Sequence, residues 1–114
     1  TTEIYTLSLH DALPIFKLAR REIDRFKRNY PDDYRGQFLE GELLSLEGKT
    51  SAAIEQLLSV CQRCPTDYDA QRKLGLLYYK QGDRVKAKQF FENYLALKPT
   101  ADDIEYIRGY LNEK

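Results

Sequence analysis

The sequence predicts an all-α fold in which antiparallel helical hairpins stack into a solenoid of about two and a half repeats. Prolines recur every 34 residues, at Pro31, Pro65 and Pro99. Gly41 and Gly75 keep the same interval, and a period of this length is typical of stacked helix-turn-helix repeats. Apolar residues follow helical spacing, and no stretch alternates as a strand would. Such a stack offers an extended surface rather than a reaction centre, so we expect a binding function.

The composition is that of an ordinary globular domain, with 114 residues, 42% of them hydrophobic and 32% charged. The 18 Lys and Arg residues balance the 18 Asp and Glu residues, so no net charge would draw the chain toward nucleic acid or anionic lipid. No apolar run approaches the roughly 18 residues of a membrane span. The compartment is left open, with the cytoplasm favoured over the periplasm.

Candidate chemical groups are few, and we expect neither a cofactor nor a metal. His10 is the one histidine, whereas a zinc site takes about four ligands. Cys61 and Cys64 form a C-x-x-C pattern, but a redox motif of this type belongs in a βαβ setting, which the sequence lacks. We therefore expect Cys61 to be a packing residue, and we expect the chain not to be an enzyme.

Residues 1–15 do not fit the repeat, because Leu7 stands where the later blocks have glycine and Pro14 replaces the turn glycine. The segment resembles translated sequencing-adapter read-through, and we expect it to be a leader foreign to the fold. The alternative is a divergent lead-in helix. Residues 16–33 then form a half repeat with a helix over Phe16–Tyr30. Without a partner before it, that helix would expose apolar surface through which the chain could self-associate.

Two complete repeats follow, over residues 34–67 and 68–101. The first helix of each carries the recurrent glycine, and the second carries an alanine, Ala53 or Ala87. Because these residues are small, we expect the two helices of each hairpin to approach closely.

Turn and cap signals mark the helix ends. Gly48 and Gly82 stand just beyond the first helix of each repeat, where a residue in the left-handed conformation commonly ends a helix. Residues 102–114 are expected to form a capping helix that starts at a capping box made by Thr100 and Asp103. We expect its polar side chains to face water, as the end of a repeat stack requires, and they are Asp102, Glu105, Arg108 and Asn112.

The later repeat carries a set of residues at fixed positions, namely Leu74, Gly75, Tyr78–Asp83, Ala87, Phe91 and Pro99. This pattern resembles the tetratricopeptide repeat family. The earlier repeat departs from it at Glu40, where the family has leucine, and both repeats have glutamine, Gln37 and Gln71, where the family favours tryptophan. The resemblance covers about residues 15 to 113 and implies a protein-binding solenoid.

The resemblance also implies that the first helix of each repeat lines a concave groove. Phe38 and Glu42 stand where chaperone-binding members have a lysine and an asparagine, so we do not expect an acidic chaperone tail as the ligand. Aromatic and arginine side chains in the groove suit a peptide or protein segment, although Tyr106 and Tyr110 could simply pack on the second repeat. The groove residues are Arg35, Phe38, Glu42, Ser45, Leu46, Asp69, Arg72, Leu76, Tyr79, Lys80, Asp103, Tyr106 and Tyr110.

Two further interpretations stay open. The chain could be a structural segment of a larger helical-repeat solenoid or assembly. It could also bind nucleic acid through a basic helix over residues 17–28. We favour a solvated helix face there and expect no nucleic-acid partner, because Glu22 and Asp24 interrupt the basic residues. These residues are Lys17, Arg20, Arg21, Arg25, Lys27 and Arg28.

Overall fold

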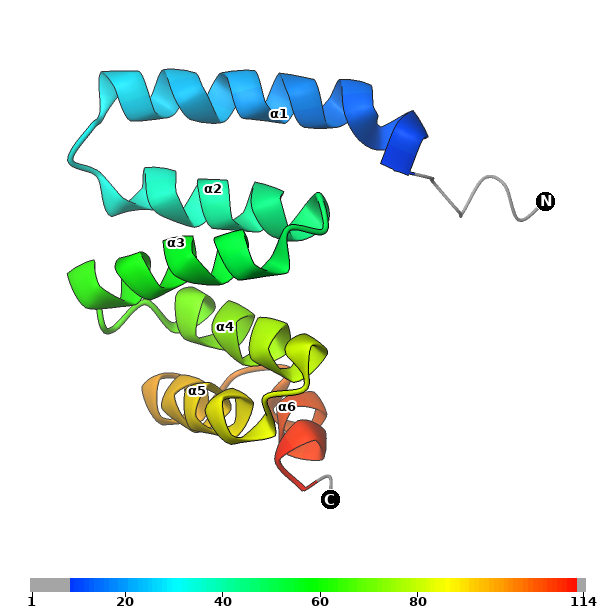
Figure 1. Ribbon diagram of the computed structural model, residues 1–114. Helices are drawn as coiled ribbons and strands as arrows, with labels where there is room; N and C mark the ends of the chain where they lie inside the picture. Colours follow the sequence, from blue (N-terminus) through cyan, green and yellow to red (C-terminus); the bar gives the residue numbers. More distant parts are fainter. Residues whose placement is uncertain (1–8, 113–114) are drawn as a thin grey trace.

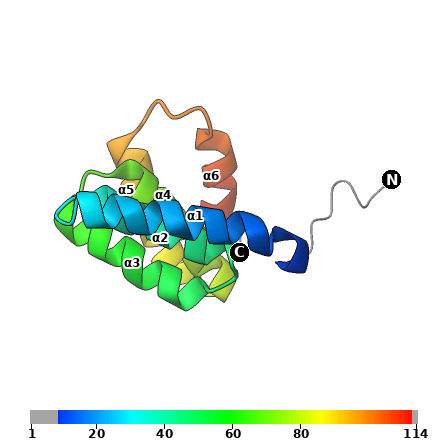
Figure 2. The same cartoon turned by 90° about the horizontal axis from the view of Figure 1, so that it is seen from above.

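The computed structural model describes residues 9–112, which form six α-helices joined by short turns. The helices are α1 (Leu9–Asn29), α2 (Tyr34–Leu46), α3 (Thr50–Arg63), α4 (Tyr68–Gln81), α5 (Arg84–Leu97) and α6 (Ile104–Leu111). Figure 1 shows α1 to α5 stacked one below the next, with α6 at the far end. Seen from above, α6 crosses the direction of α1, so the stack twists along its length (Figure 2). The predicted all-α helical-repeat fold is confirmed, and none of these helices is long and apolar enough to cross a membrane.

The two hairpins, α2–α3 and α4–α5, close at the recurrent glycines. A Cβ atom on Gly41 would lie 2.9 Å from Cγ of Leu57. A Cβ atom on Gly75 would lie 2.5 Å from two ring carbons of Phe91. Both distances are well below the van der Waals contact distance of two carbon atoms. A larger residue at either position would therefore push the helices apart. The prediction that small residues allow a close approach is confirmed at both positions.

One hydrophobic core runs through α3, α4, α5 and α6. Tyr78 of α4 and Phe90 of α5 stack at its side, with ring centroids 5.5 Å apart. Burial of each large apolar side chain stabilises the fold by roughly 1.5 to 3 kcal/mol, so the stack depends on contacts between neighbouring helices. Its largest fully buried side chains are Phe91, Leu57, Leu74, Ile107 and Val60.

Short-range signals set the helix ends. Asp33, Asp67 and Asp83 precede α2, α4 and α5, and each carboxylate accepts a hydrogen bond from a backbone N–H of the first turn. Gly48 and Gly82 follow α2 and α4 with φ values of 82° and 87°. This left-handed conformation is costly for a residue with a Cβ atom, so the glycines end the helices as predicted.

The first helix differs from the expectation. α1 begins at Leu9 rather than at Phe16, so the predicted boundary between leader and half repeat falls inside a continuous helix. Pro14 lies within α1, where it lacks the N–H needed for a helical hydrogen bond. Figure 1 shows the first turn of α1 displaced from the axis of the rest. The part of the predicted leader over residues 1–8 lies outside the described residues.

The last helix also differs, because α6 is eight residues long instead of filling 102–114. The predicted capping box is wrong, since the Asp103 side chain makes no cap hydrogen bond. Its carboxylate instead accepts hydrogen bonds from Nε of Arg72 and the hydroxyl of Tyr94, both at 2.6 Å. Asp103 therefore ties the start of α6 to α4 and α5. The polar residues expected to face water are exposed, namely Asp102, Glu105, Arg108 and Asn112.

Candidate functional site

The predicted groove residues share one surface, which we call the groove face. Within each helix they lie three or four positions apart, a spacing that places side chains on the same side. An ion pair between Glu42 and Lys73 links α2 to α4, and contacts of Arg72 with Asp103 and of Tyr79 with Tyr110 link α4 to α6. It comprises Arg35, Phe38, Glu42, Ser45 and Leu46 from α2, Asp69, Arg72, Leu76, Tyr79 and Lys80 from α4, and Asp103, Tyr106 and Tyr110 at α6.

Ion pairs cross from helix to helix on this face. Glu42 of α2 lies 3.4 Å from Nζ of Lys73 on α4, and Arg72 of α4 lies 2.6 Å from Asp103 before α6. Burial alone would raise the pKa of Asp103, but hydrogen bonds from Tyr94 and Arg72 favour the carboxylate and leave the pKa lowered. Lys73 was missed by sequence reasoning, although it sits one turn from Asp69 on the same side of the helix.

Three tyrosines bridge α4 and α6. The rings of Tyr79 and Tyr110 meet edge to face with centroids 4.7 Å apart, and Tyr110 also stacks on Phe91 at 5.1 Å. The hydroxyls of Tyr106 and Tyr110 are hydrogen-bonded at 2.7 Å. That hydrogen bond, with burial as a second cause, raises the pKa of Tyr110 to about 12. Tyr110 therefore packs on the second repeat, whereas Tyr106 keeps 57% of its surface exposed.

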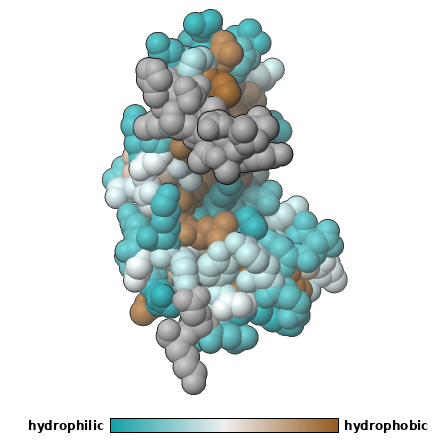
Figure 3. Space-filling view, turned by 90° about the vertical axis from the view of Figure 1, so that its right-hand side faces the viewer, coloured by the Kyte–Doolittle hydropathy of each residue, from teal (hydrophilic) through white to brown (hydrophobic). Residues whose placement is uncertain are grey.

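The apolar members of the groove face divide into anchored and exposed side chains. Phe38, Leu76 and Tyr79 are half-buried and pack against the core. Leu46, at the end of α2, is 70% exposed. Figure 3 shows one side of the stack, on which some apolar side chains are visible between polar ones. The groove face thus offers apolar contact area that the fold itself does not use.

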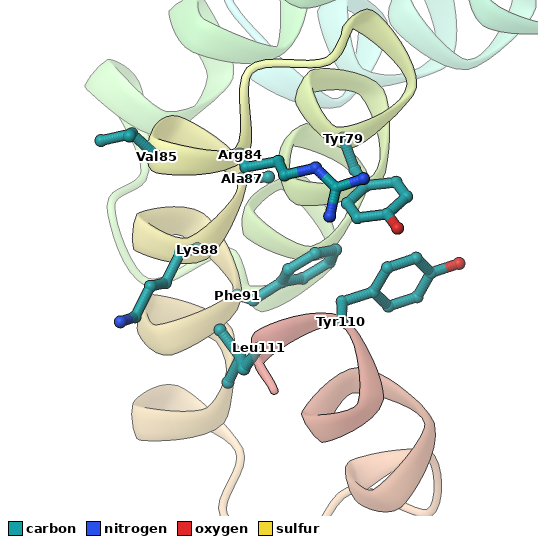
Figure 4. A pocket seen from close by; sticks show the side chains of 8 residues that line it. All are labelled: Tyr79, Arg84, Val85, Ala87, Lys88, Phe91, Tyr110 and Leu111. Carbon is teal, nitrogen blue, oxygen red and sulfur yellow. The ribbon is translucent and has the colours of Figure 1, made fainter. Parts of the chain in front are cut away.

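A pocket of about 240 Å³ adjoins the groove face at Tyr79 and Tyr110. In Figure 4 the rings of Tyr79, Phe91 and Tyr110 and the side chain of Arg84 converge, while Val85 points away. The Arg84 guanidinium lies 5.0 Å from the centroid of the Tyr79 ring, within cation–π range. The pocket is lined by Tyr79, Arg84, Val85, Ala87, Lys88, Phe91, Tyr110 and Leu111.

Comparisons with known proteins agree with this architecture. A TPR repeat model matches residues 41–82, and a tetratricopeptide repeat model matches residues 69–100. The chain belongs to the tetratricopeptide repeat family. The human protein O-mannosyl-transferase TMTC3 is 28% identical over 102 residues, which is 89% of this chain. The chain spans 10% of the length of that relative.

The structure accounts for the departures from the tetratricopeptide repeat pattern. Gln37 donates to Oγ of Ser59 at 3.0 Å, and Gln71 accepts from Asn93 at 3.2 Å. Each glutamine therefore links the first helix of its repeat to the second. Glu40, at a position where the family has leucine, is buried against α1.

The basic residues of α1 divide between internal pairing and solvent. Arg20 and Lys27 both pair with the buried carboxylate of Glu40 on α2, the latter at 3.3 Å. Arg25 pairs with Glu22 one turn away at 3.3 Å. Burial would raise the pKa of Glu40, but hydrogen bonds from the two cations leave it lowered. Part of the basic run thus holds α1 on the stack, which reduces the charge available to a nucleic acid.

The cysteines show no sign of a reactive site. Cys61 and Cys64 are both reduced and half-buried. Burial raises the pKa of the Cys61 thiol to about 11, which leaves little thiolate at neutral pH. Among the described residues, no group of three His, Cys, Asp or Glu side chains lies close enough together to hold a metal ion.

Proposed function

We propose that this tetratricopeptide repeat chain binds a peptide or protein segment along the groove face. Repeats of this family are typically protein-interaction modules. The observation that carries the proposal is the pair of exposed apolar side chains, Leu46 on α2 and Tyr106 on α6, on a face otherwise tied together by contacts between helices. Tyrosine is enriched among the residues that dominate binding energy, and an exposed leucine beside it adds apolar contact area.

Selection from a displayed library of random 12-residue peptides tests the proposal. Leu46→Glu combined with Tyr106→Ala removes two exposed side chains and leaves every buried side chain in place, although it also removes the hydrogen bond between Tyr106 and Tyr110. Peptides selected on the wild type should bind the variant at least about tenfold more weakly. Arg72 and Tyr79 are poor choices, because they hold α6 in place. Leu97→Glu, at an exposed position on α5, is the matched control. Equal binding to wild type and to the double variant would refute the groove assignment.

A second candidate is a structural role inside a larger protein. It is favoured by the match to TMTC3, in which a region like this chain is a small part of a long protein. In that case the groove face would be covered by another part of the parent chain. Backbone amides around Leu46 and Tyr106 would then exchange hydrogen more slowly in the complete parent protein than in this chain. Equal exchange rates would exclude this role.

A further inference from the structure

The charges of the groove face are balanced and almost fully paired. Its cationic groups, counted with the neighbouring Lys73, are Arg35, Arg72, Lys73 and Lys80. Its anionic groups, counted with the cap residue Asp33, are Asp33, Glu42, Asp69 and Asp103. Three ion pairs use six of these eight groups, because Arg35 also pairs with Asp33 at 2.6 Å. A strongly acidic or basic ligand would therefore meet no excess of opposite charge here.

Asp69 and Lys80 are the two groups that remain. Both belong to α4, both are exposed, and among the described residues neither has an ion-pair partner. Asp69 lies in the first turn and Lys80 in the last. Eleven residues separate them, which is about three helical turns and about 16 Å along the axis. Since each residue turns the helix by about 100°, both side chains project from the same side of α4.

Between these two charges, Arg72 and Lys73 come one turn after Asp69, each held in an ion pair, and apolar side chains follow before Lys80. Leu76 lies on the same side of α4 one turn before Lys80, and both Leu76 and the neighbouring Tyr79 are half-buried. Leu46 of α2 and Tyr106 of α6 stand on the flanking helices. Apart from the groups that are held in ion pairs, the surface along α4 therefore has an acidic side chain at one end, a basic side chain at the other end and apolar side chains between the ion pairs and Lys80.

We infer that the groove face binds an extended segment with an apolar centre, a basic residue that pairs with Asp69 and an acidic residue that pairs with Lys80. An extended chain rises about 3.3 Å per residue, so the two charged residues stand about five positions apart. The inference rests on the proposed function. It also fixes the direction of the bound segment, because reversing the segment would place like charges together at both ends.

The same display experiment, repeated on a charge-swapped protein, tests this inference. In Asp69→Lys with Lys80→Glu the net charge is kept and both exposed sites stay on the helix surface. Peptides selected on the wild type should carry basic and acidic residues in one order around an apolar centre, and peptides selected on the swapped protein should carry them in the opposite order. Each set should bind its own protein about tenfold more tightly than the other, since two surface attractions become two repulsions.

Two outcomes separate the inference from the proposed function. Peptides that depend on Leu46 and Tyr106 but ignore the swap, or that are purely acidic, overturn the charge inference alone. Peptides that ignore Leu46 and Tyr106, or a selection that enriches none, overturn groove binding itself. The control swap is Lys49→Glu with Glu55→Lys, at exposed positions at the start of α3, and it should leave the affinity of wild-type peptides unchanged.

Discussion

Gly75 of α4 faces the ring of Phe91 on α5 so closely that a Cβ atom would lie 2.5 Å from two ring carbons. Phe91 is fully buried, so its ring has no space into which to retreat. Gly109 occupies the corresponding slot on α6, 34 residues on, where a Cβ atom would meet nothing within 4 Å. The same repeat position is therefore sterically closed in one helix and open in another.

Alanine substitutions at these glycines should change stability in opposite directions. Gly75→Ala should lower the free energy of unfolding by about 1 to 3 kcal/mol, because the added methyl overpacks a rigid core. Gly109→Ala should raise it by about 0.5 to 1 kcal/mol, because alanine favours a helix interior. Urea unfolding followed by circular dichroism, with the m-value held constant, measures both changes. A loss of stability in Gly109→Ala would show that another element covers this slot.

The sequence predicted these packing positions because they depend on a short-range repeat. The glycine slots, the left-handed turns at Gly48 and Gly82 and the helical hairpins all follow from spacing. Asp103 was placed wrongly, because its sequence position suits a helix cap, whereas its carboxylate is engaged by Arg72 and Tyr94 from two other helices. A local sequence pattern does not show that side chains from distant helices will bind this carboxylate in place of the backbone N–H groups of its own helix.

Within the candidate site, sequence spacing predicted which residues share a face but not how their charges pair. The ion pair of Glu42 with Lys73 joins helices of different repeats. The ion pairs decide which charges are left for a ligand. They join residues that are distant in the sequence, so they could be found only from the three-dimensional arrangement.

Acid should weaken the attachment of α6 through Asp103. The folded-state pKa of Asp103 is lowered, whereas aspartate in an unfolded chain titrates near pH 3.9. The contribution of the carboxylate is thus complete above that pH and is lost as the pH falls through the lower folded-state pKa. Asp103→Asn should destabilise the protein at pH 7, and the difference from wild type should shrink near pH 3. Unfolding in urea at both pH values measures this, with exposed Asp102→Asn as the control. A difference that does not vary with pH would contradict the assignment.

High pH should destabilise the folded protein through the ionisation of two tyrosines, Tyr94 and Tyr110. Burial and the hydrogen bond to Asp103 raise the pKa of Tyr94 to about 12, and Tyr110 is raised to about 12 as well. A tyrosine in the unfolded chain ionises near pH 10, so stability is complete below that pH and is lost as the pH rises toward 12. Ultraviolet titration of tyrosinate absorbance should show a late phase near pH 12 that is smaller by one residue in Tyr94→Phe. A late phase of the same size in Tyr94→Phe and in the wild type would rule out the assignment.

Glu40 tests whether the ion pairs of α1 are needed for stability or only for satisfying a buried charge. Glu40→Ala leaves Arg20 and Lys27 facing an apolar gap, and it should lower the free energy of unfolding by about 1 to 2 kcal/mol, since Arg20 is itself a third exposed. Glu40→Leu restores the leucine of the other repeat and should cost less, because apolar packing can replace a buried ion pair. Combining Glu40→Leu with Arg20→Leu should recover most of the wild-type stability. Thermal unfolding of the three variants decides between these roles, and an equal loss in all three would mean that the carboxylate itself holds α1 on the stack.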